Sequence, residues 1–308
     1  MEKLKTLTFK KIDAFTKGIS SGNPAGYVYL NDDESLTENE MIRMARELKG
    51  YVNEIGYVQR VADEFHLQYY SAECKVAFCG HATIAIMYDL LKEDKELITR
   101  QEVFINVDAG KLSVFNHLHE EDAVYIMAPD PAFLACRLAT HPIAESLGAA
   151  IADIDEVHPV KLIDGGLRTL LVPLKTLSGC LGLTPDQERL KSFCLENDID
   201  IVLVFTDDTF TSEAGYRTRV FAPRFGYLED PATGSGNSAF GYYLVDQGLW
   251  SGDLMVEQGP DRKNPNYVKL KKYTRNGKMN ILFGGCATTR MEGRYYLHGE
   301  LPCLISSP

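Results

Sequence analysis

The chain lacks the features that would place it in a membrane or on a nucleic acid. No apolar run approaches the roughly 20 residues that a membrane-spanning helix needs, and Met1 to Lys5 lead into a strand-like segment rather than a signal sequence. Lysine and arginine number 32 against 43 aspartates and glutamates, which gives a net charge of −11. Because no basic patch with interleaved aromatic residues is present, we expect neither nucleic acid nor membrane as a partner.

Local signatures of disulfides, metals and nucleotides are also absent. The seven cysteines are odd in number and have no paired spacing, which favours a reducing cytoplasm over a disulfide framework. Cys74 and Cys79 are too far apart for a CxxC motif, and no pair of histidines supplies a metal-ligand spacing. The glycine-rich run 233–237 is followed by no lysine and does not read GxGxxG. We therefore expect no metal and no nucleotide cofactor.

Two short stretches carry most of the chemical information. Residues 78–83 read Phe-Cys-Gly-His-Ala-Thr, and residues 230–237 read Asp-Pro-Ala-Thr-Gly-Ser-Gly-Asn. Small residues lead in each case into an amphipathic run, so each stretch is predicted to be a loop that begins a helix. The free N–H groups at a helix start bind carboxylates or phosphates without a basic side chain. Two such starts predict a two-sided clamp for a small anion.

These two loops occupy matching places in an internal duplication. Thr37 and Thr184 are predicted helix N-caps, since each is followed three residues later by a carboxylate or amide that can close a capping box. Each predicted helix is followed by a short apolar strand, and 17 positions separate Thr37 from Glu54 and Thr184 from Ile201. The duplication predicts two similar halves, divided at the prolines 129 and 131 into residues 1–128 and 129–308, with the C-terminal tail able to pack back on the first half.

The duplication makes Glu54 conspicuous. The first half has this carboxylate where the second half has Ile201, although an otherwise apolar strand begins at both positions. Partial burial would raise the pKa of Glu54 toward neutrality, where one group can both accept and donate a proton. Glu54 is therefore the candidate general acid/base, and a solvated glutamate at a strand end is the alternative. His81 and Asp230 are equally compatible with catalytic roles and with structural roles at a helix start. Ser235 is a hydroxyl at a helix N-terminus and a poor candidate for a nucleophile.

The ordered set of these motifs resembles the PhzF-like, or phenazine-biosynthesis-like, proteins, which share a fold superfamily with diaminopimelate epimerase and proline racemase. The resemblance implies an α/β (α+β) protein of two pseudo-symmetric halves, each a curved, mainly antiparallel sheet wrapped around a central helix, with the site between them. It also implies a homodimer. The stretches that carry it are 13–16, 22–25, 53–55, 78–83, 221–226 and 229–235.

The resemblance also implies an activity and a set of site residues. Characterised family members isomerise a small carboxylate-bearing substrate by moving a proton between carbons, without metal or organic cofactor. Glu54 falls on the position of the proton-transferring glutamate, and His81, Asp230 and Ser235 fall on residues that position the substrate and assist the transfer. Main-chain amides and neighbouring side chains would hold the substrate. The residues expected to do so are Asn23, Cys79, Gly80, Ala82, Thr233, Gly234 and Gly236.

Two further hypotheses remain open. The epimerase branch of the superfamily uses two thiols, but here Cys79 is matched by Thr233, whose hydroxyl is a weak acid. An epimerase or racemase that pairs Cys79 with Glu54 is one alternative, and a non-catalytic small-anion-binding protein on the same scaffold is the other. The segment 258–266 is predicted to be a loop without chemistry of its own.

Overall fold

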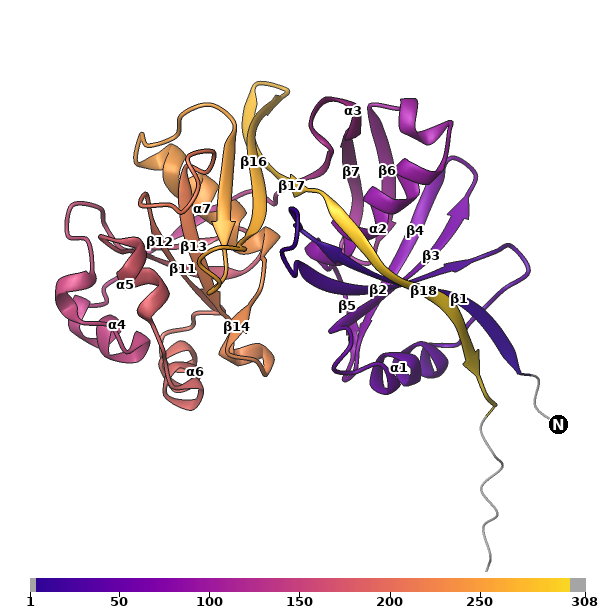
Figure 1. Ribbon diagram of the computed structural model, residues 1–308, viewed down its shortest axis with the longest axis horizontal. Helices are drawn as coiled ribbons and strands as arrows, with labels where there is room; N and C mark the ends of the chain where they lie inside the picture. The colour runs from indigo at the N-terminus through magenta and orange to yellow at the C-terminus, as the bar shows by residue number, and fades with distance from the viewer. Residues whose placement is uncertain (1–3, 300–308) are drawn as a thin grey trace, which may run out of the picture.

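The structure, a computed structural model, describes residues 4–299 and forms two lobes that lie side by side (Figure 1). The first lobe is a curved sheet around helix α2, with α1 packed outside it. Its elements are β1 (Lys5–Ala14), β2 (Asn23–Leu30), α1 (Glu38–Glu47), β3 (Glu54–Val61), β4 (Glu64–Ser71), β5 (Lys75–Val76), α2 (Gly80–Glu93), β6 (Glu102–Val107), β7 (Gly110–His117), α3 (Leu118–Glu121) and β8 (Ala123–Met127).

The second lobe repeats this plan around helix α7. Its elements are β9 (Ala132–Leu134), α4 (Thr140–Leu147), β10 (Lys161–Asp164), β11 (Arg168–Pro173), α5 (Leu177–Gly182), α6 (Gln187–Glu196), β12 (Ile201–Thr206), β13 (Tyr216–Phe221), β14 (Glu229–Asp230), α7 (Gly234–Asp246), β15 (Leu254–Gln258), β16 (Asn266–Arg275) and β17 (Lys278–Gly285). The chain returns to the first lobe as β18 (Ala287–Leu297).

Strand pairing confirms the predicted duplication and the mainly antiparallel sheets. In each lobe a parallel pair, β2 with β3 or β11 with β12, is followed by an antiparallel hairpin, β3 with β4 or β12 with β13. A two-residue strand then precedes the central helix, and the remaining strands pair in the same order. Glu54 and Ile201 occupy equivalent positions, because each begins the second strand of its parallel pair.

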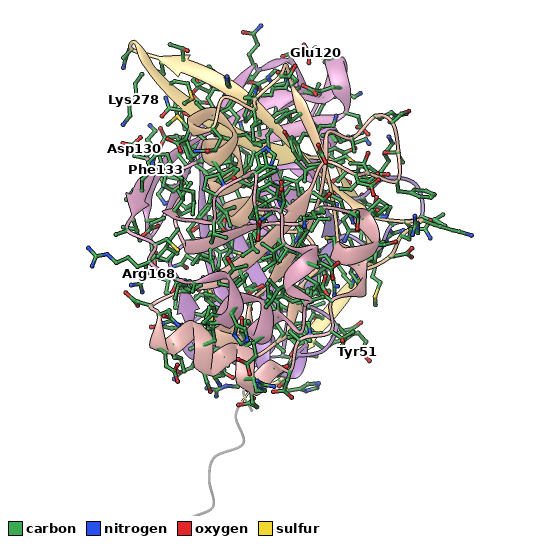
Figure 2. All side chains as sticks on the ribbon, turned by 90° about the vertical axis from the view of Figure 1, so that its left-hand side faces the viewer. Tyr51, Glu120, Asp130, Phe133, Arg168 and Lys278 are labelled. Atoms are coloured by element: carbon green, nitrogen blue, oxygen red, sulfur yellow. The ribbon has the colours of Figure 1, made fainter. Side chains whose placement is uncertain are left out.

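The two lobes are joined by strands that cross between them. β17 pairs with β8, and β18 pairs with β1 along nearly its whole length. The link between β8 and β9 runs over the surface, where Asp130 forms an ion pair with Lys278 of β17 (Figure 2). The division into residues 1–128 and 129–308 remains a prediction, while β18 belongs to the sheet of the first lobe.

Both central helices are largely apolar and buried, because sheets surround them. Nearly every side chain of α2 from Ala82 to Leu91 is buried, as is most of α7 from Gly236 to Leu244. Within residues 4–299, no helix combines the length and the apolar character that crossing a membrane demands. A glycine permits the close approach of β3 to α2, since a Cβ atom at Gly56 would overlap the side chain of Ile86.

Two local predictions need correction. Thr37 caps α1 with a complete capping box as predicted, but α6 is capped by Asp186 rather than Thr184. Asp186 accepts a hydrogen bond from the Arg189 N–H, and a carboxylate is as strong an N-cap as a hydroxyl. The segment 258–266 is a loop only in its middle, because Gln258 ends β15 and Asn266 begins β16. Both of these residues help to hold the site together.

Candidate active site

The two predicted helix starts meet at one aromatic ring. Helices α2 and α7 begin at Gly80 and Gly234, as the two motifs predict. A Cβ atom at Gly80 would lie 3.3 Å from Phe283 Cε2, and one at Gly234 would lie 2.6 Å from Phe283 Cδ2. Phe283 of β17 therefore lies against both helix tips, and the absence of side chains at the two glycines lets the tips approach each other. The two helix starts thus lie close to each other, both against the Phe283 ring.

Glu54 lies beside the tip of α2. It is the first residue of β3 and points to the same face as Gly56, because side chains two apart on a strand share a face. That face packs on α2, and the Glu54 side chain is only 19% exposed. Burial, reinforced by the negative charge of Asp230, raises the pKa of Glu54 to about 7. The alternative of a solvated strand-end glutamate is therefore wrong.

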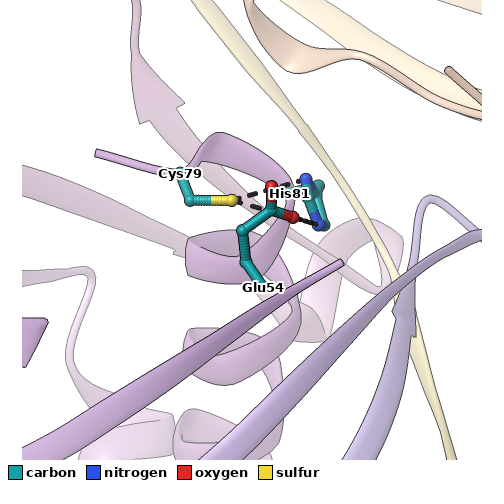
Figure 3. A group of neighbouring side chains, drawn as sticks. All are labelled: Glu54, Cys79 and His81. Carbon is teal, nitrogen blue, oxygen red and sulfur yellow. Dashed lines mark hydrogen bonds and ion pairs between the residues drawn. The ribbon is translucent and has the colours of Figure 1, made fainter. Parts of the chain in front are cut away.

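His81 and Cys79 complete a compact group with Glu54 (Figure 3). His81 Nε2 lies 3.4 Å from Glu54 Oε2, and Cys79 Sγ lies 3.5 Å from His81 Nδ1. Burial lowers the pKa of His81 to about 4, although an interaction with the Pro24 backbone opposes this shift. Burial and the Glu54 carboxylate raise the pKa of the Cys79 thiol well above its ordinary value. At neutral pH the imidazole and the thiol are therefore both uncharged.

Asp230 lies on the second lobe and contacts neither His81 nor the α7 amides through a hydrogen bond within the described residues. Its Oδ1 accepts a 2.8 Å hydrogen bond from Asn23 Nδ2, and its other oxygen accepts from the Thr233 hydroxyl. Burial raises the pKa of Asp230 to about 6, and these two donors limit the rise. The carboxylate is thus fixed in place, and it acts on Glu54 through its charge.

Gln258 belongs to this network, although the sequence predicts only a loop without chemistry at this position. Its Oε1 accepts hydrogen bonds from the Thr233 N–H at 3.0 Å and from Asn237 Nδ2 at 2.6 Å. Its Nε2 donates to the Asp230 carbonyl at 2.9 Å and to Thr233 Oγ1 at 3.0 Å. A glutamine beside Gly259 and Pro260 looks like the edge of a loop, so only the pairing of β15 with β13 and β16 reveals its role.

Asn266 performs a similar function between the lobes. Its Oδ1 accepts a 2.8 Å hydrogen bond from the Gly22 N–H, and its Nδ2 donates to the Pro231 carbonyl at 2.7 Å. Gly22 has a φ of +70°, and a Cβ atom there would lie 2.6 Å from Thr16. The turn before Asn23 is therefore tied to the loop before α7, which keeps Asn23 next to Asp230.

The remaining predicted site residues lie near this group and differ in burial and in hydrogen bonding. Gly234 and Gly236 are buried, while Ser235 is partly exposed and its hydroxyl forms no hydrogen bond with any described residue. Ala82 is buried in the first turn of α2, where its backbone interacts with Cys79. Three buried acceptor atoms have no hydrogen-bond partner in the described part of the chain and lie on residues of these motifs. They are Asn23 Oδ1, Glu54 Oε2 and Asn237 Oδ1.

The same group can hold a metal ion. One ligand-type atom from each of Glu54, Cys79 and His81 lies within 4.8 Å of the other two. Spacing along the chain predicts no metal, because Glu54 is far from Cys79 in the sequence. The fold of β3 against α2 removes that separation.

The comparison with known proteins agrees with this architecture. The sequence model of the phenazine biosynthesis-like proteins matches residues 12–293. An uncharacterized isomerase of Bacillus subtilis, YfhB, is 28% identical and covers 90% of this chain and 94% of its own. A PhzF-family phenazine biosynthesis protein from Bacillus anthracis superposes with a TM-score of 0.83 at 26% identity, over 94% of this chain and 99% of its own.

A more distant structure shares the fold alone. A predicted epimerase from Pseudomonas aeruginosa has a TM-score of 0.73 at 18% identity and covers 96% of this chain and all of its own. The structural likenesses confirm the predicted fold class, and the family model and the sequence relatives confirm the predicted kind of enzyme, an isomerase. With its family model matched over nearly the whole length, the chain belongs to the phenazine biosynthesis-like (PhzC-PhzF) family.

Proposed function

We propose that the protein moves a proton between two carbons of a small carboxylate-bearing substrate, with Glu54 as the group that removes the proton and returns it. The single observation that carries this proposal is the position of Glu54, partly buried at the α2 tip and without a hydrogen-bond partner for its Oε2 among the described residues. A pKa of about 7 makes both protonation states available near neutrality, which is what one group acting as base and then as acid needs.

The spacing of the candidate acids favours transfer on one face of the substrate. Two groups that flank the same carbon, each about 3–3.5 Å from it, must be roughly 6–7 Å apart. Glu54 and Cys79 present atoms within 4.8 Å of each other, both from the first lobe. In the second lobe, the Thr233 hydroxyl donates a hydrogen bond to the Asp230 carboxylate. This arrangement supports a proton shift and argues against epimerisation by Glu54 and Cys79.

The helix tips supply the electrostatic part of the mechanism. Removing a proton next to a carboxyl-bearing or conjugated carbon creates negative charge on the substrate. Fixed N–H groups from Gly80, His81, Gly234 and Ser235 would stabilise that charge at the positive ends of two helices. His81 is uncharged at neutral pH, so its ring can orient the Glu54 carboxyl group without neutralising it. Burial raises the pKa of Glu54, and the negative charge of Asp230 reinforces this rise.

A metabolite screen tests the proposal. Small carboxylates are screened by thermal shift, because a ligand that binds the native state stabilises it by mass action. Each hit is then incubated with the enzyme and followed by proton NMR. The proposal expects a product in which a hydrogen has changed its carbon. A product that differs only in configuration would instead identify an epimerase, and stable binding without any product across the hits would identify an anion-binding protein.

A further inference from the structure

The side chains of Glu54, Cys79 and His81, which form the proposed proton-transfer site, are also of the types that bind metal ions. The three side chains present a carboxylate oxygen, a sulfur and an imidazole nitrogen, which are the three ligand types that Zn²⁺ binds in proteins. The backbone holds them firmly, since Glu54 begins a sheet strand while Cys79 and His81 flank the first residue of α2. No sequence motif predicts that these three side chains form a set of metal ligands.

One of their three separations fits tetrahedral coordination as it stands, and that between Cys79 Sγ and His81 Nε2 is longer. With Zn–S near 2.3 Å and Zn–N or Zn–O near 2.0–2.2 Å, tetrahedral ligand atoms lie roughly 3.3–3.7 Å apart. His81 Nε2 is 3.4 Å from Glu54 Oε2 and 3.9 Å from Cys79 Sγ. The remaining separation, between Glu54 and Cys79, is at most 4.8 Å. Binding one ion therefore requires Cys79 Sγ to move closer to His81 Nε2 than the present 3.9 Å.

The surroundings suit a cation that binds through these ligands. Glu54 Oε2 is buried and accepts no hydrogen bond from a described residue, and the Asp230 carboxylate adds negative charge nearby. The backbone of Ala82 interacts favourably with the Cys79 thiolate, as the start of a helix does in general. The Pro24 backbone contacts the His81 ring and can orient it, as outer-shell groups do in metal sites.

We propose that Glu54, Cys79 and His81 bind one Zn²⁺ ion, with the fourth position left to water. Coordination converts the Cys79 thiol to a thiolate and releases its proton to solvent. It also engages Glu54 Oε2, which accepts no hydrogen bond from a described residue. Binding itself is independent of the proposed function. The expected effect of binding is reversible inhibition by Zn²⁺, because the ion would occupy the Glu54 carboxylate that accepts the proton. This effect rests on the proposed function.

Cobalt provides a direct spectroscopic test. The full-length protein is treated with EDTA, freed of chelator and titrated with Co²⁺, which takes zinc sites and absorbs in the near ultraviolet when a thiolate coordinates it. We expect this absorption to saturate at one Co²⁺ per chain and to disappear on addition of Zn²⁺. Cys79→Ser should abolish it, and His81→Asn and Glu54→Gln should each weaken Co²⁺ binding by at least about tenfold. Cys74→Ser, at an exposed thiol, is the matched control and should leave it unchanged.

The outcomes separate this proposal from the proposed function. A thiolate–cobalt absorption that survives in Cys79→Ser, or no such absorption in wild type, would overturn the metal site. Circular dichroism of each variant verifies that a lost signal does not reflect unfolding. The spectrum requires no turnover, so it can be positive even if no isomerase activity is found, and it can be negative while Glu54 still transfers protons.

Discussion

Asn23 Nδ2 donates a 2.8 Å hydrogen bond to Asp230 Oδ1, and this bond joins the two lobes at the point where their helix tips meet. The same amide also donates to the Ala232 carbonyl at 2.8 Å, so it fixes the carboxylate and the loop before α7 together. Asn23 and Asp230 are both buried. Hydrogen bonds between buried groups therefore tie the two lobes together at the site.

The Phe283 ring leaves no room for a side chain at Gly234, the first residue of α7. Gly234→Ala should destabilise the protein by about 1–3 kcal/mol, because the added methyl group would collide with the Phe283 ring. Gly80→Ala, whose Cβ atom would lie 3.3 Å from the same ring, is the matched control and should have a smaller effect. Urea unfolding measures both. Phe283→Leu should recover part of the loss in the double variant, and equal effects of the two alanines would contradict this packing.

Gln258 should stabilise the loop that precedes α7. Gln258→Leu leaves the Thr233 N–H without its acceptor and leaves the Asn237 amide with only the Thr233 carbonyl, which should lower the free energy of unfolding by about 1–3 kcal/mol. Hydrogen exchange of residues 230–237 should accelerate in this variant. Gln101→Leu, at an exposed position, serves as the control. Unchanged exchange in the loop would show that Gln258 does not hold it.

The raised pKa of Glu54 predicts a definite pH dependence of stability. Between the ordinary value of 4.5 and the folded value of about 7, the folded state binds this proton and the unfolded state does not. This group therefore lowers the free energy of unfolding as pH rises through that window. Glu54→Gln removes the effect and should be more stable than wild type above pH 7, by about 1–3 kcal/mol.

The control lies in the same pH series. Below pH 4.5 the Glu54 carboxyl group is protonated in both states, so the two proteins should converge. Asp230 and His81 titrate in both proteins and largely cancel in the difference. Urea unfolding in the presence of EDTA gives the comparison. A difference that is constant with pH would mean that Glu54 has an ordinary pKa.

Cys79 should be unreactive and dispensable for a one-face proton shift. Its thiol is buried and its pKa is raised well above the ordinary value, so little thiolate is present at neutral pH. Iodoacetamide should alkylate the exposed Cys74 first, as peptide mass spectrometry can show. Cys79→Ser should retain turnover within about tenfold, whereas loss of turnover in this variant with intact ligand binding would favour the epimerase hypothesis.

The sequence alone predicts the repeated architecture and the residues at the two helix starts. Periodicity and capping predicted α1, β3, β12 and both central helices, because those signals lie within a few neighbouring residues. Glu54 was found by comparing the two halves, where Ile201 takes its place. Local signals also predicted Thr184 as a cap, but Asp186 competes two residues later and becomes the N-cap.

What the sequence could not show depends on contacts between distant segments. Gln258 and Asn266 gain their roles only when β15 and β16 join the sheet of the second lobe. The group of Glu54, Cys79 and His81 likewise requires β3 to pack on α2. The homodimer, the cytoplasmic location and the division at residue 128 remain predictions. Sedimentation of the purified chain would test the first of them.

The most direct test of the central claim is solvent-deuterium incorporation into the ligand that the screen identifies. In heavy water, wild type should place deuterium on the carbon that receives the proton. Glu54→Gln should bind the ligand but exchange at least about 10²-fold more slowly, while Glu73→Gln, at an exposed position, should match wild type. Exchange at the wild-type rate in Glu54→Gln would contradict the assignment of Glu54 as the proton carrier.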